Sequence, residues 1–321
     1  MHQSHARALC AALSITAFFI VATGIAAAQT YPARPIRIIT TVPGSGTDLV
    51  ARMLAQGLTS ALGQQAVVDN RGIVGIETAA KAAPDGYTLL LYTSPLWLTP
   101  VFRNDVSWDV LRDFTPIMSP TTTPNVLVVH PSVAAKSVQE LIAYAKAKPG
   151  ALNYASGSTA ASAHIAAELF KSMAGVDFVR VNFKGTGPAL TALLGGEVQV
   201  MFPAAGSVTP HVKAGKLRAL AVTSAQPSAL APGLPTVAAA GLPGYESSSL
   251  TGIFAPAKTP SAIVNRLNDE MGRTLGRPDV KERLFVSGLE VIALPPAEFT
   301  KFIRTEVARM EKMVKSAGLR E

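Results

Sequence analysis

Short β-branched runs alternate along this sequence with stripes of apolar residues at helical spacing, and this alternation constrains the fold most. Residues 36–42 form such a run, and an apolar stripe between Leu49 and Leu62 follows it and ends at Gly63. Strands that alternate with helices predict an α/β fold with mostly parallel sheets. Further strands are expected at 66–69, 87–92, 125–129, 152–155, 178–182, 198–202, 217–223 and 253–255. Further helices are expected at 76–82, 137–146, up to Met173, around Pro188, and at 261–275 and 297–317.

Polar residues at the predicted helix starts agree with the apolar pattern. Thr47 is expected to cap the first helix, with Asp48 in its first turn, where the helix dipole favours a carboxylate. Ser137 and Glu140 have the spacing of a capping box. Pro188 fits the first turn of another helix, since a missing N–H costs nothing there.

Loops rich in Gly, Ser and Thr follow some of the predicted strands, where parallel sheets bind their ligands. They span residues 43–47, 156–159 and 184–187, and each precedes a predicted helix, whose unpaired N–H groups and dipole favour an anion. Each loop taken alone is better explained as a tight turn, but loops of one shared chemistry predict a common anion site. The candidate ligand-binding residues are Gly44, Ser45, Gly46, Thr47, Ser94, Ser156, Gly157, Ser158, Lys184, Gly185, Thr186 and Gly187.

Two of these candidates have equally simple alternative explanations. Lys184 is the charged residue of the loops, and it either faces a ligand carboxylate or is an ordinary solvated lysine. Ser94 follows a predicted strand, and it either donates to a ligand or caps a short turn.

The N-terminal residues 1–28 have the pattern of a secretory signal peptide. Arg7 is followed by an apolar run from Ala8 to Ala22, and Ala26 to Ala28 supply the small residues of a cleavage site. A membrane anchor is the alternative, but polar residues interrupt the run and a span needs about 20 apolar residues. Cleavage would remove Cys10, the only cysteine, and leave a thiol-free protein that we expect in the periplasm.

The charge of the chain excludes some partners. The formal net charge is +8, but Lys and Arg are dispersed singly and no nucleic-acid-binding motif is present, so we expect no nucleic acid partner. A mildly positive field that attracts anionic solutes is the simpler explanation. Hydrophobic residues make up 48% of the chain, which is typical of a globular protein.

Motifs for catalysis are missing from the sequence. There is no G-x-S-x-G elbow, no P-loop and no complete dinucleotide fingerprint. His130, His164 and His211 are far apart, and each is better explained as a helix or loop histidine than as a base or metal ligand. We therefore expect no enzymatic activity, no cofactor and no metal.

Several segments carry motifs typical of one family. The first is YPARPIRIITTVPGSGTDLVAR at 31–52. Others are AAPDGYTLLL at 82–91, PNVLVVHPS at 124–132, LNYASGS at 152–158, FKGTGPALTALLGGEVQVMF at 183–202, AGKLRALAVTSA at 214–225, LPTVAAAGLPGYE at 234–246 and MVKSAGL at 313–319. In this order they resemble the Bug family, the substrate-binding proteins of tripartite tricarboxylate transporters.

The resemblance implies a two-lobed periplasmic-binding-protein fold of the Venus-flytrap, type II-like kind. The first lobe would comprise residues 29–127 and 252–321, and the second would comprise 128–251. It also implies a small carboxylate in the cleft, held by backbone and hydroxyl donors and water, with residues 44–47 and 184–187 as the pincer loops. The implied partners are integral-membrane permease subunits, and a monomer is the default.

The chain departs from the family pattern at a few positions. Ser45 stands where the family usually has a glycine in the first loop, and Pro203 stands where it often has an aspartate. Loss of that carboxylate would remove a partner for a ligand amino group. We therefore expect a simple carboxylate to be preferred over an amino acid.

Three functions compete on this evidence. A transport receptor would deliver its ligand to a membrane permease, whereas a soluble periplasmic sensor would deliver the same ligand to a signalling partner. An enzyme on the same fold would turn the bound solute over. The sequence does not identify the carboxylate.

Overall fold

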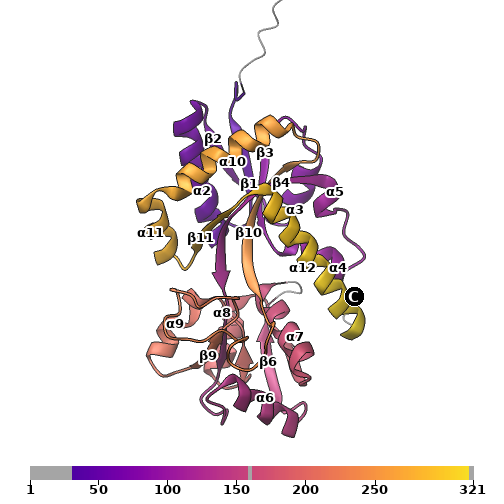
Figure 1. The fold of residues 1–321 in the computed structure, drawn as a ribbon, viewed down its shortest axis with the longest axis vertical. Coiled ribbons are helices and arrows are strands. Elements are labelled where there is room, and N and C mark those ends of the chain that lie inside the picture. Colours follow the sequence, from indigo (N-terminus) through magenta and orange to yellow (C-terminus); the bar gives the residue numbers. More distant parts are fainter. Residues whose placement is uncertain (1–30, 158–160, 318–321) are drawn as a thin grey trace, which may run out of the picture. The chain divides into compact units, whose positions relative to one another are not determined.

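The computed structural model describes residues 31–157 and 161–317, and in this part of the chain the strands form two sheets (Figure 1). The first sheet has the strand order β11-β4-β10-β3-β1-β2. Its strands are β1 (Ile36–Thr40), β2 (Ala66–Asn70), β3 (Thr88–Thr93), β4 (Phe114–Pro124), β10 (Ser248–Pro256) and β11 (Glu290–Leu294). The helices that precede or follow these strands in the chain are α2 (Gly46–Leu62), α3 (Val74–Ala80), α4 (Pro95–Phe102), α5 (Val110–Asp113), α10 (Ser261–Gly276), α11 (Pro278–Val286) and α12 (Pro296–Ala317).

The second sheet has the strand order β7-β6-β8-β5-β9. Its strands are β5 (Val126–Val129), β6 (Leu152–Ser156), β7 (Phe178–Asn182), β8 (Val200–Met201) and β9 (Arg218–Val222). The helices between these strands are α6 (Val138–Ala147), α7 (Ser162–Ala174), α8 (Thr186–Leu194) and α9 (Ala205–Lys213). The predicted α/β architecture with two sheets is confirmed.

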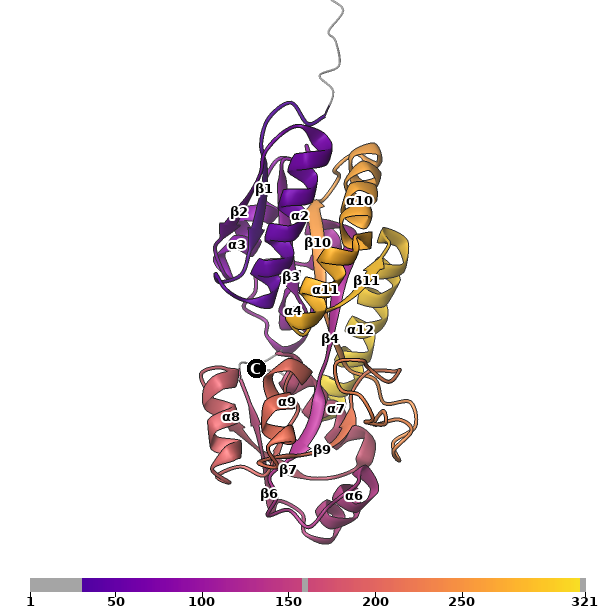
Figure 2. The same ribbon diagram turned by 90° about the vertical axis from the view of Figure 1, so that its left-hand side faces the viewer.

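The chain crosses from the first sheet to the second along β4 and β5, which Asn125 separates, and it returns along β10 (Figure 2). Strand β10 pairs antiparallel with β3 and β4, and β5 pairs antiparallel with β8 and β9. Parallel pairs join β1 to β2 and β3, and β6 to β7 and β8. The expectation of mostly parallel sheets is therefore wrong, because the outgoing and returning crossings run side by side in opposite directions. The exact lobe boundaries stay a prediction.

The start of α2 differs from the expectation that Thr47 caps it. Ser45 is the N-cap, in an extended conformation with φ −76° and ψ 161°, and its hydroxyl accepts a hydrogen bond from the Asp48 N–H at 3.1 Å. Helix α2 thus begins at Gly46, which places Thr47 inside the first turn. Gly63 ends the helix in the left-handed conformation, as predicted.

One cluster of buried apolar side chains extends through both sheets. It runs from Ile39 on β1 to Phe254 on β10 and on to Phe170 on α7 and Phe178 on β7. The ring of Phe102 on α4, a member of this cluster, also contacts His164 on α7, with centroids 5.5 Å apart. A second cluster, which includes Val126, lies among the strands and helices of the second sheet.

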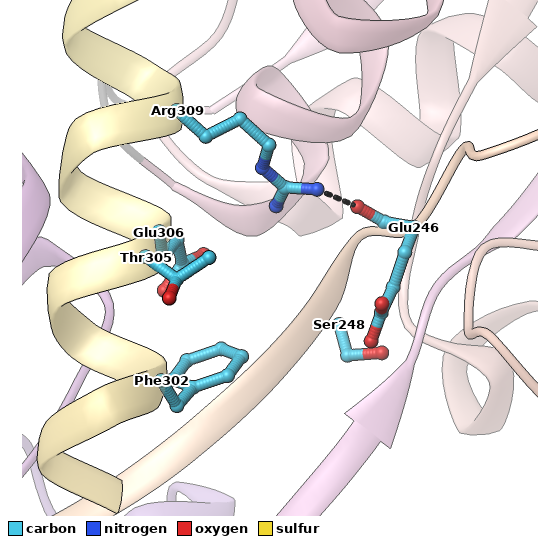
Figure 3. A pocket seen from close by; sticks show the side chains of 6 residues that line it. All are labelled: Glu246, Ser248, Phe302, Thr305, Glu306 and Arg309. Atoms are coloured by element: carbon cyan, nitrogen blue, oxygen red, sulfur yellow. Dashed lines mark hydrogen bonds between the residues drawn. The ribbon is translucent and has the colours of Figure 1, made fainter.

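Helix α12 packs on α4 beside a small acidic cavity of about 120 Å³. The cavity is lined by Glu246, Ser248, Phe302, Thr305, Glu306 and Arg309 (Figure 3). Arg309 donates to the main-chain oxygen of Glu246 at 2.7 Å. The Glu306 carboxylate accepts a hydrogen bond from the Trp97 indole at 2.6 Å.

The predicted signal peptide at 1–28 and the candidate Ser158 lie outside the described residues. Within the described ranges, no helix combines the length and the apolar character that a membrane span requires. The same ranges contain no group of His, Cys, Asp and Glu side chains arranged to hold a metal ion.

Candidate functional site

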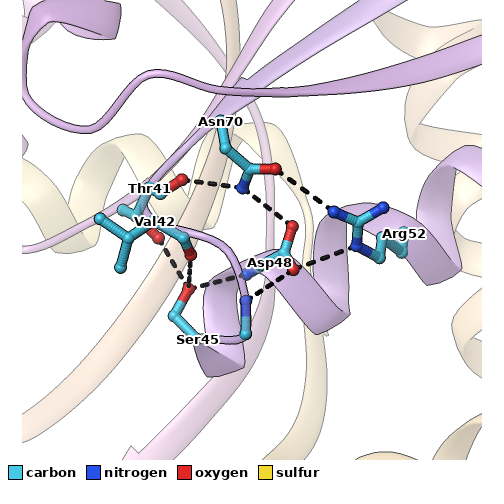
Figure 4. Close-up of polar contacts among 7 residues, drawn as sticks. Thr41, Val42, Ser45, Asp48, Arg52 and Asn70 are labelled. Carbon is cyan, nitrogen blue, oxygen red and sulfur yellow. Dashed lines mark hydrogen bonds and ion pairs between the residues drawn. The ribbon is translucent and has the colours of Figure 1, made fainter.

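A network of hydrogen bonds fixes the loop before α2 (Figure 4). Gly44 has φ +76°, which favours glycine, and its N–H donates to the Asp48 carboxylate at 3.0 Å. The same carboxylate accepts from Arg52 Nε at 3.0 Å and from Asn70 Nδ2 at 2.9 Å. Burial alone would raise the pKa of Asp48, but these hydrogen bonds outweigh it and hold the pKa below its ordinary value. An ionised Asp48 therefore fixes the start of α2.

This start of α2 forms one wall of a cavity of about 300 Å³. The cavity is also lined by the N-terminal turns of α7 and α9, the ends of β3 and β4, part of β10, and the turn between α11 and β11. Its lining residues are Gly46, Thr47, Thr93, Thr123, Asn125, Ser162, Ala204, Gly206, Ser207, Ser249, Thr251, Ser287, Gly288 and Leu289. Its volume lies at the lower end of the range for small-molecule sites, roughly 300–1,000 Å³.

The chemistry of this lining suits an anion. Serine and threonine hydroxyls dominate it, and none of the described residues that line it carries a charged side chain. Helices α2, α7 and α9 direct their N-terminal ends to the cavity, and each helix dipole favours negative charge at this end. Of the first-turn N–H groups, that of Asp48 is already bonded to the Ser45 hydroxyl and that of Ser207 to the Ala204 carbonyl. The acidic cavity of Figure 3 suits an anion less well, because its lining places two glutamates beside one arginine.

Buried hydroxyls hold the crossing strands together at the cavity. Thr121 and Thr251 share a hydroxyl hydrogen bond of 2.8 Å, and Ser119 donates to the Thr251 carbonyl at 2.6 Å. All three residues are buried. The wall formed by β4 and β10 is therefore fixed by side chains as well as by the strand ladder.

The structure brings only part of the predicted site together at this cavity. Gly46 and Thr47 line it, whereas Gly44 and Ser45 shape the loop behind them. Ser94 is buried directly after the lining residue Thr93, and its carbonyl accepts hydrogen bonds at the start of α4. These contacts of Gly44, Ser45 and Ser94 are all made within the protein and do not require a bound ligand.

The other predicted loops lie against each other. A Cβ on Gly157 would lie 3.6 Å from the backbone of Gly185, and the Phe183 N–H donates to the Ser156 carbonyl at 2.9 Å. The buried Ser156 hydroxyl accepts from Arg180 Nε at 2.9 Å. Lys184 to Gly187 are not among the described lining residues.

Sequence reasoning missed several lining residues, and Asn125 is the most informative. Asn125 is fully buried between β4 and β5, and neither atom of its side-chain amide has a hydrogen-bond partner among the residues that the structure describes. A polar residue at the head of the apolar run 126–129 was the available signal. Gly206 and Ser207 were missed because Pro210 obscures the helical pattern of α9.

The prediction that the histidines are ordinary helix or loop residues can be compared with the surroundings of His164. His164 is buried on α7, and burial, aided by the positive charges of Arg180 and Lys171, lowers its pKa to about 3. The imidazole is neutral at physiological pH, so it packs as an uncharged ring.

Comparisons with known proteins indicate the family to which this fold belongs. The model of a family described as tripartite tricarboxylate transporter family receptor matches residues 50–319. Protein BugT of Bordetella pertussis is 36% identical to this chain over 95% of the chain and 97% of that protein.

Two solved structures contain named ligands. Rpa4515 from R. palustris, solved with adipate, is 34% identical with a TM-score of 0.75, over 90% of this chain and 98% of that one. MatC from Rhodopseudomonas palustris, solved with bound malate, is 30% identical with a TM-score of 0.73, over 88% of this chain and 100% of that one.

Proposed function

This chain belongs to the tripartite tricarboxylate transporter receptor family, and we propose that it captures its small carboxylate in the cavity between Gly46, Asn125 and Gly206. It is a solute-binding receptor, as the family match and the related structures indicate. The observation that supports the proposed location most strongly is the convergence of the N-terminal turns of α2, α7 and α9 on one uncharged, hydroxyl-lined space.

The chemistry of relatives supports a carboxylate. One relative was solved with adipate and another with malate, and both ligands are small dicarboxylates. Hydroxyls and backbone N–H groups bind such anions without a basic side chain when helix N-termini supply the positive potential. None of the described lining residues is an acid, and Pro203 stands next to the lining residue Ala204, which supports a simple carboxylate over an amino acid.

We propose that the predicted loops surround this cavity. Gly44 and Ser45 hold the α2 wall, and Ser94 follows the lining residue Thr93. The paired loops at 156–157 and 184–187 would form the rim, close to Ser162 along the chain. Lys184 then either guides the anion to the rim or is a solvated loop lysine.

We further propose export to the periplasm by the signal peptide at 1–28, action as a monomer, and delivery of the ligand to integral-membrane permease subunits. A periplasmic sensor is the second candidate, because the same cavity would serve it. Copurification of the loaded receptor with a permease favours transport, whereas copurification with a sensor kinase favours signalling. Turnover of the bound solute would indicate an enzyme.

A thermal-shift screen of residues 29–321 tests the binding function. The panel contains mono-, di- and tricarboxylates, amino acids and sugars. A ligand at 100 times its dissociation constant adds about 2.7 kcal/mol of stability, which raises the melting temperature by several degrees. Stabilisation by carboxylates is expected, and stabilisation by sugars or cations alone would contradict the anion cavity.

A further inference from the structure

Asn125 lines the cavity with a buried side-chain amide that has no partner among the described residues. Asn125 is 0% exposed, it lines the cavity, and its Nδ2 and Oδ1 atoms both lack hydrogen bonds to any part of the chain that the structure describes. Buried amides are nearly always hydrogen-bonded, and an unpaired one costs free energy. A group outside the protein chain is therefore expected to satisfy it.

The backbone of Asn125 is fixed, so the side chain has little freedom to find another partner. The Asn125 N–H donates to the Thr223 hydroxyl at 3.1 Å, and its carbonyl accepts from the Thr223 N–H at 2.9 Å. The next residue, Val126, donates to the Pro203 carbonyl at 2.8 Å. These contacts come from the residue after β9 and from the segment before α9, and they hold Asn125 at the junction of β4 and β5.

A side-chain amide makes two different demands on its partner. Its NH₂ group needs an acceptor and its oxygen needs a donor, whichever way round the amide lies. An ionised carboxylate offers only acceptors, so it satisfies Nδ2 and leaves Oδ1 unpaired. A hydroxyl on the ligand supplies the missing donor. An ammonium would also supply one, but none of the described lining residues is an acid that could balance its charge.

We propose that Asn125 selects hydroxycarboxylates over the corresponding unsubstituted carboxylates, by donating to a carboxylate oxygen and accepting from the ligand hydroxyl. This inference rests on the proposed carboxylate-binding function and specifies its substrate class. Sites that hydrogen-bond a ligand hydroxyl discriminate against analogues without it, because the protein group is then left unpaired.

Calorimetric titration of matched acid pairs tests the selection. The pairs are malate with succinate, and 2-hydroxyglutarate with glutarate, at pH 8, where every carboxyl group is ionised. We expect the hydroxy acid of the better-binding pair to bind about tenfold more tightly or better, a difference of about 1.4 kcal/mol. In Asn125→Leu, which has a similar shape and no polar atoms, the ratio should fall to within about twofold.

Asn268→Leu is the matched control, since Asn268 on α10 also has a buried side-chain oxygen without a partner but does not line the cavity. It should keep the wild-type ratio. Asn125→Leu should melt at or above the wild-type temperature, because it removes an unsatisfied amide; a structural role for Asn125 would instead lower the melting temperature. If Asn125→Leu does not fold, the ratio of affinities within each acid pair is measured in Asn125→Ser instead. The ratio in the wild-type protein tests the proposal in either case.

The outcomes separate the inference from the proposed function. Equal affinities within each pair, or a preference that survives Asn125→Leu, would overturn the role of Asn125 and leave carboxylate binding intact. Failure of every carboxylate to bind would contradict the proposed function and the inference with it.

Discussion

Glu306 shows how much a single buried carboxyl group can affect this protein. It is 6% exposed on α12, and burial raises its pKa to about 7. The hydrogen bond from Trp97 and the charge of Arg309 act in the opposite direction, whereas the charge of Glu246 acts with burial. Since an unfolded glutamate ionises near pH 4.3, the folded state holds a proton that the unfolded chain has already lost.

The protonation of Glu306 predicts a pH-dependent stability. The raised pKa contributes stability that is present below about pH 4.5 and is lost as the pH rises to about 7. Glu306→Gln keeps an oxygen for the Trp97 indole and cannot ionise. We expect this variant to be more stable than wild type at pH 8, by on the order of 1–3 kcal/mol, and nearly equal to it at pH 4.5.

Melting temperatures of both proteins at the two pH values measure this effect, and groups common to both proteins cancel in the difference. A variant that loses stability at pH 8 would contradict the prediction, as would the same difference at both pH values.

Single positions also show what the sequence alone could predict. Helix capping by Ser45 and the burial of the Asn125 amide both depend on the backbone conformation, which neighbouring residues do not specify. Thr47 and Ser45 are both favourable capping residues by type, and the extended conformation of Ser45 decides between them.

At the scale of elements, helices α2 and α10 pack together through a glycine. Gly57 is buried in α2, and a Cβ there would lie 2.8 Å from Cβ of Thr274 on α10. Thr274 cannot easily retreat, since that atom is bonded directly to its backbone and its hydroxyl donates to the Glu270 carbonyl at 2.9 Å. Gly57 therefore sets the distance between the two helices.

Replacing this glycine should destabilise the protein although alanine is the better helix former. Gly57→Ala is expected to cost about 1–3 kcal/mol by overpacking. Gly272→Ala on α10 is the matched control, because nothing lies within 4 Å of a Cβ at that position, and it should gain up to about 1 kcal/mol. Denaturant unfolding measures both variants, and an equal or greater stability of Gly57→Ala would show that the helices are not in tight contact there.

Strands and helices with a clear apolar pattern were predictable from the sequence, whereas those interrupted by prolines were not. Strands β1, β2 and β7 follow from β-branched runs and β3 and β6 from short runs between turn residues, and their positions are confirmed to within two residues. Strand β4 was missed because Pro116, Pro120 and Pro124 interrupt its pattern, and its pairing with β10 contains register shifts. Helix α9 was missed because of Pro210.

For the whole molecule, the sequence predicted the fold class but not how distant segments meet at the cavity. A Cβ added at Gly46 would lie 3.5 Å from Leu289 Cδ2, and one added at Gly206 would lie 3.5 Å from Gly288 Cα. These residues are far apart in the chain. They come into contact because the strands that cross between the two sheets bring their helices and turns together. Of the helix starts that the sequence predicted at the anion site, that of α2 lines the cavity, while the position of α9 at the cavity required the structure.

The claim that a carboxylate occupies this cavity is tested most directly by blocking it. Gly206 lies exposed in the first turn of α9 with no positive φ, so a tryptophan there fits the backbone and fills the cavity. Gly276→Trp, at the exposed end of α10, is the control for adding an indole elsewhere.

The deciding measurement is calorimetric titration of both tryptophan variants with the carboxylate that stabilises the wild type most. Gly206→Trp should melt close to the wild-type temperature and lose at least about 100-fold in affinity, which corresponds to about 2.7 kcal/mol, while Gly276→Trp binds as wild type. A folded Gly206→Trp with unchanged affinity would place the ligand elsewhere and contradict the account.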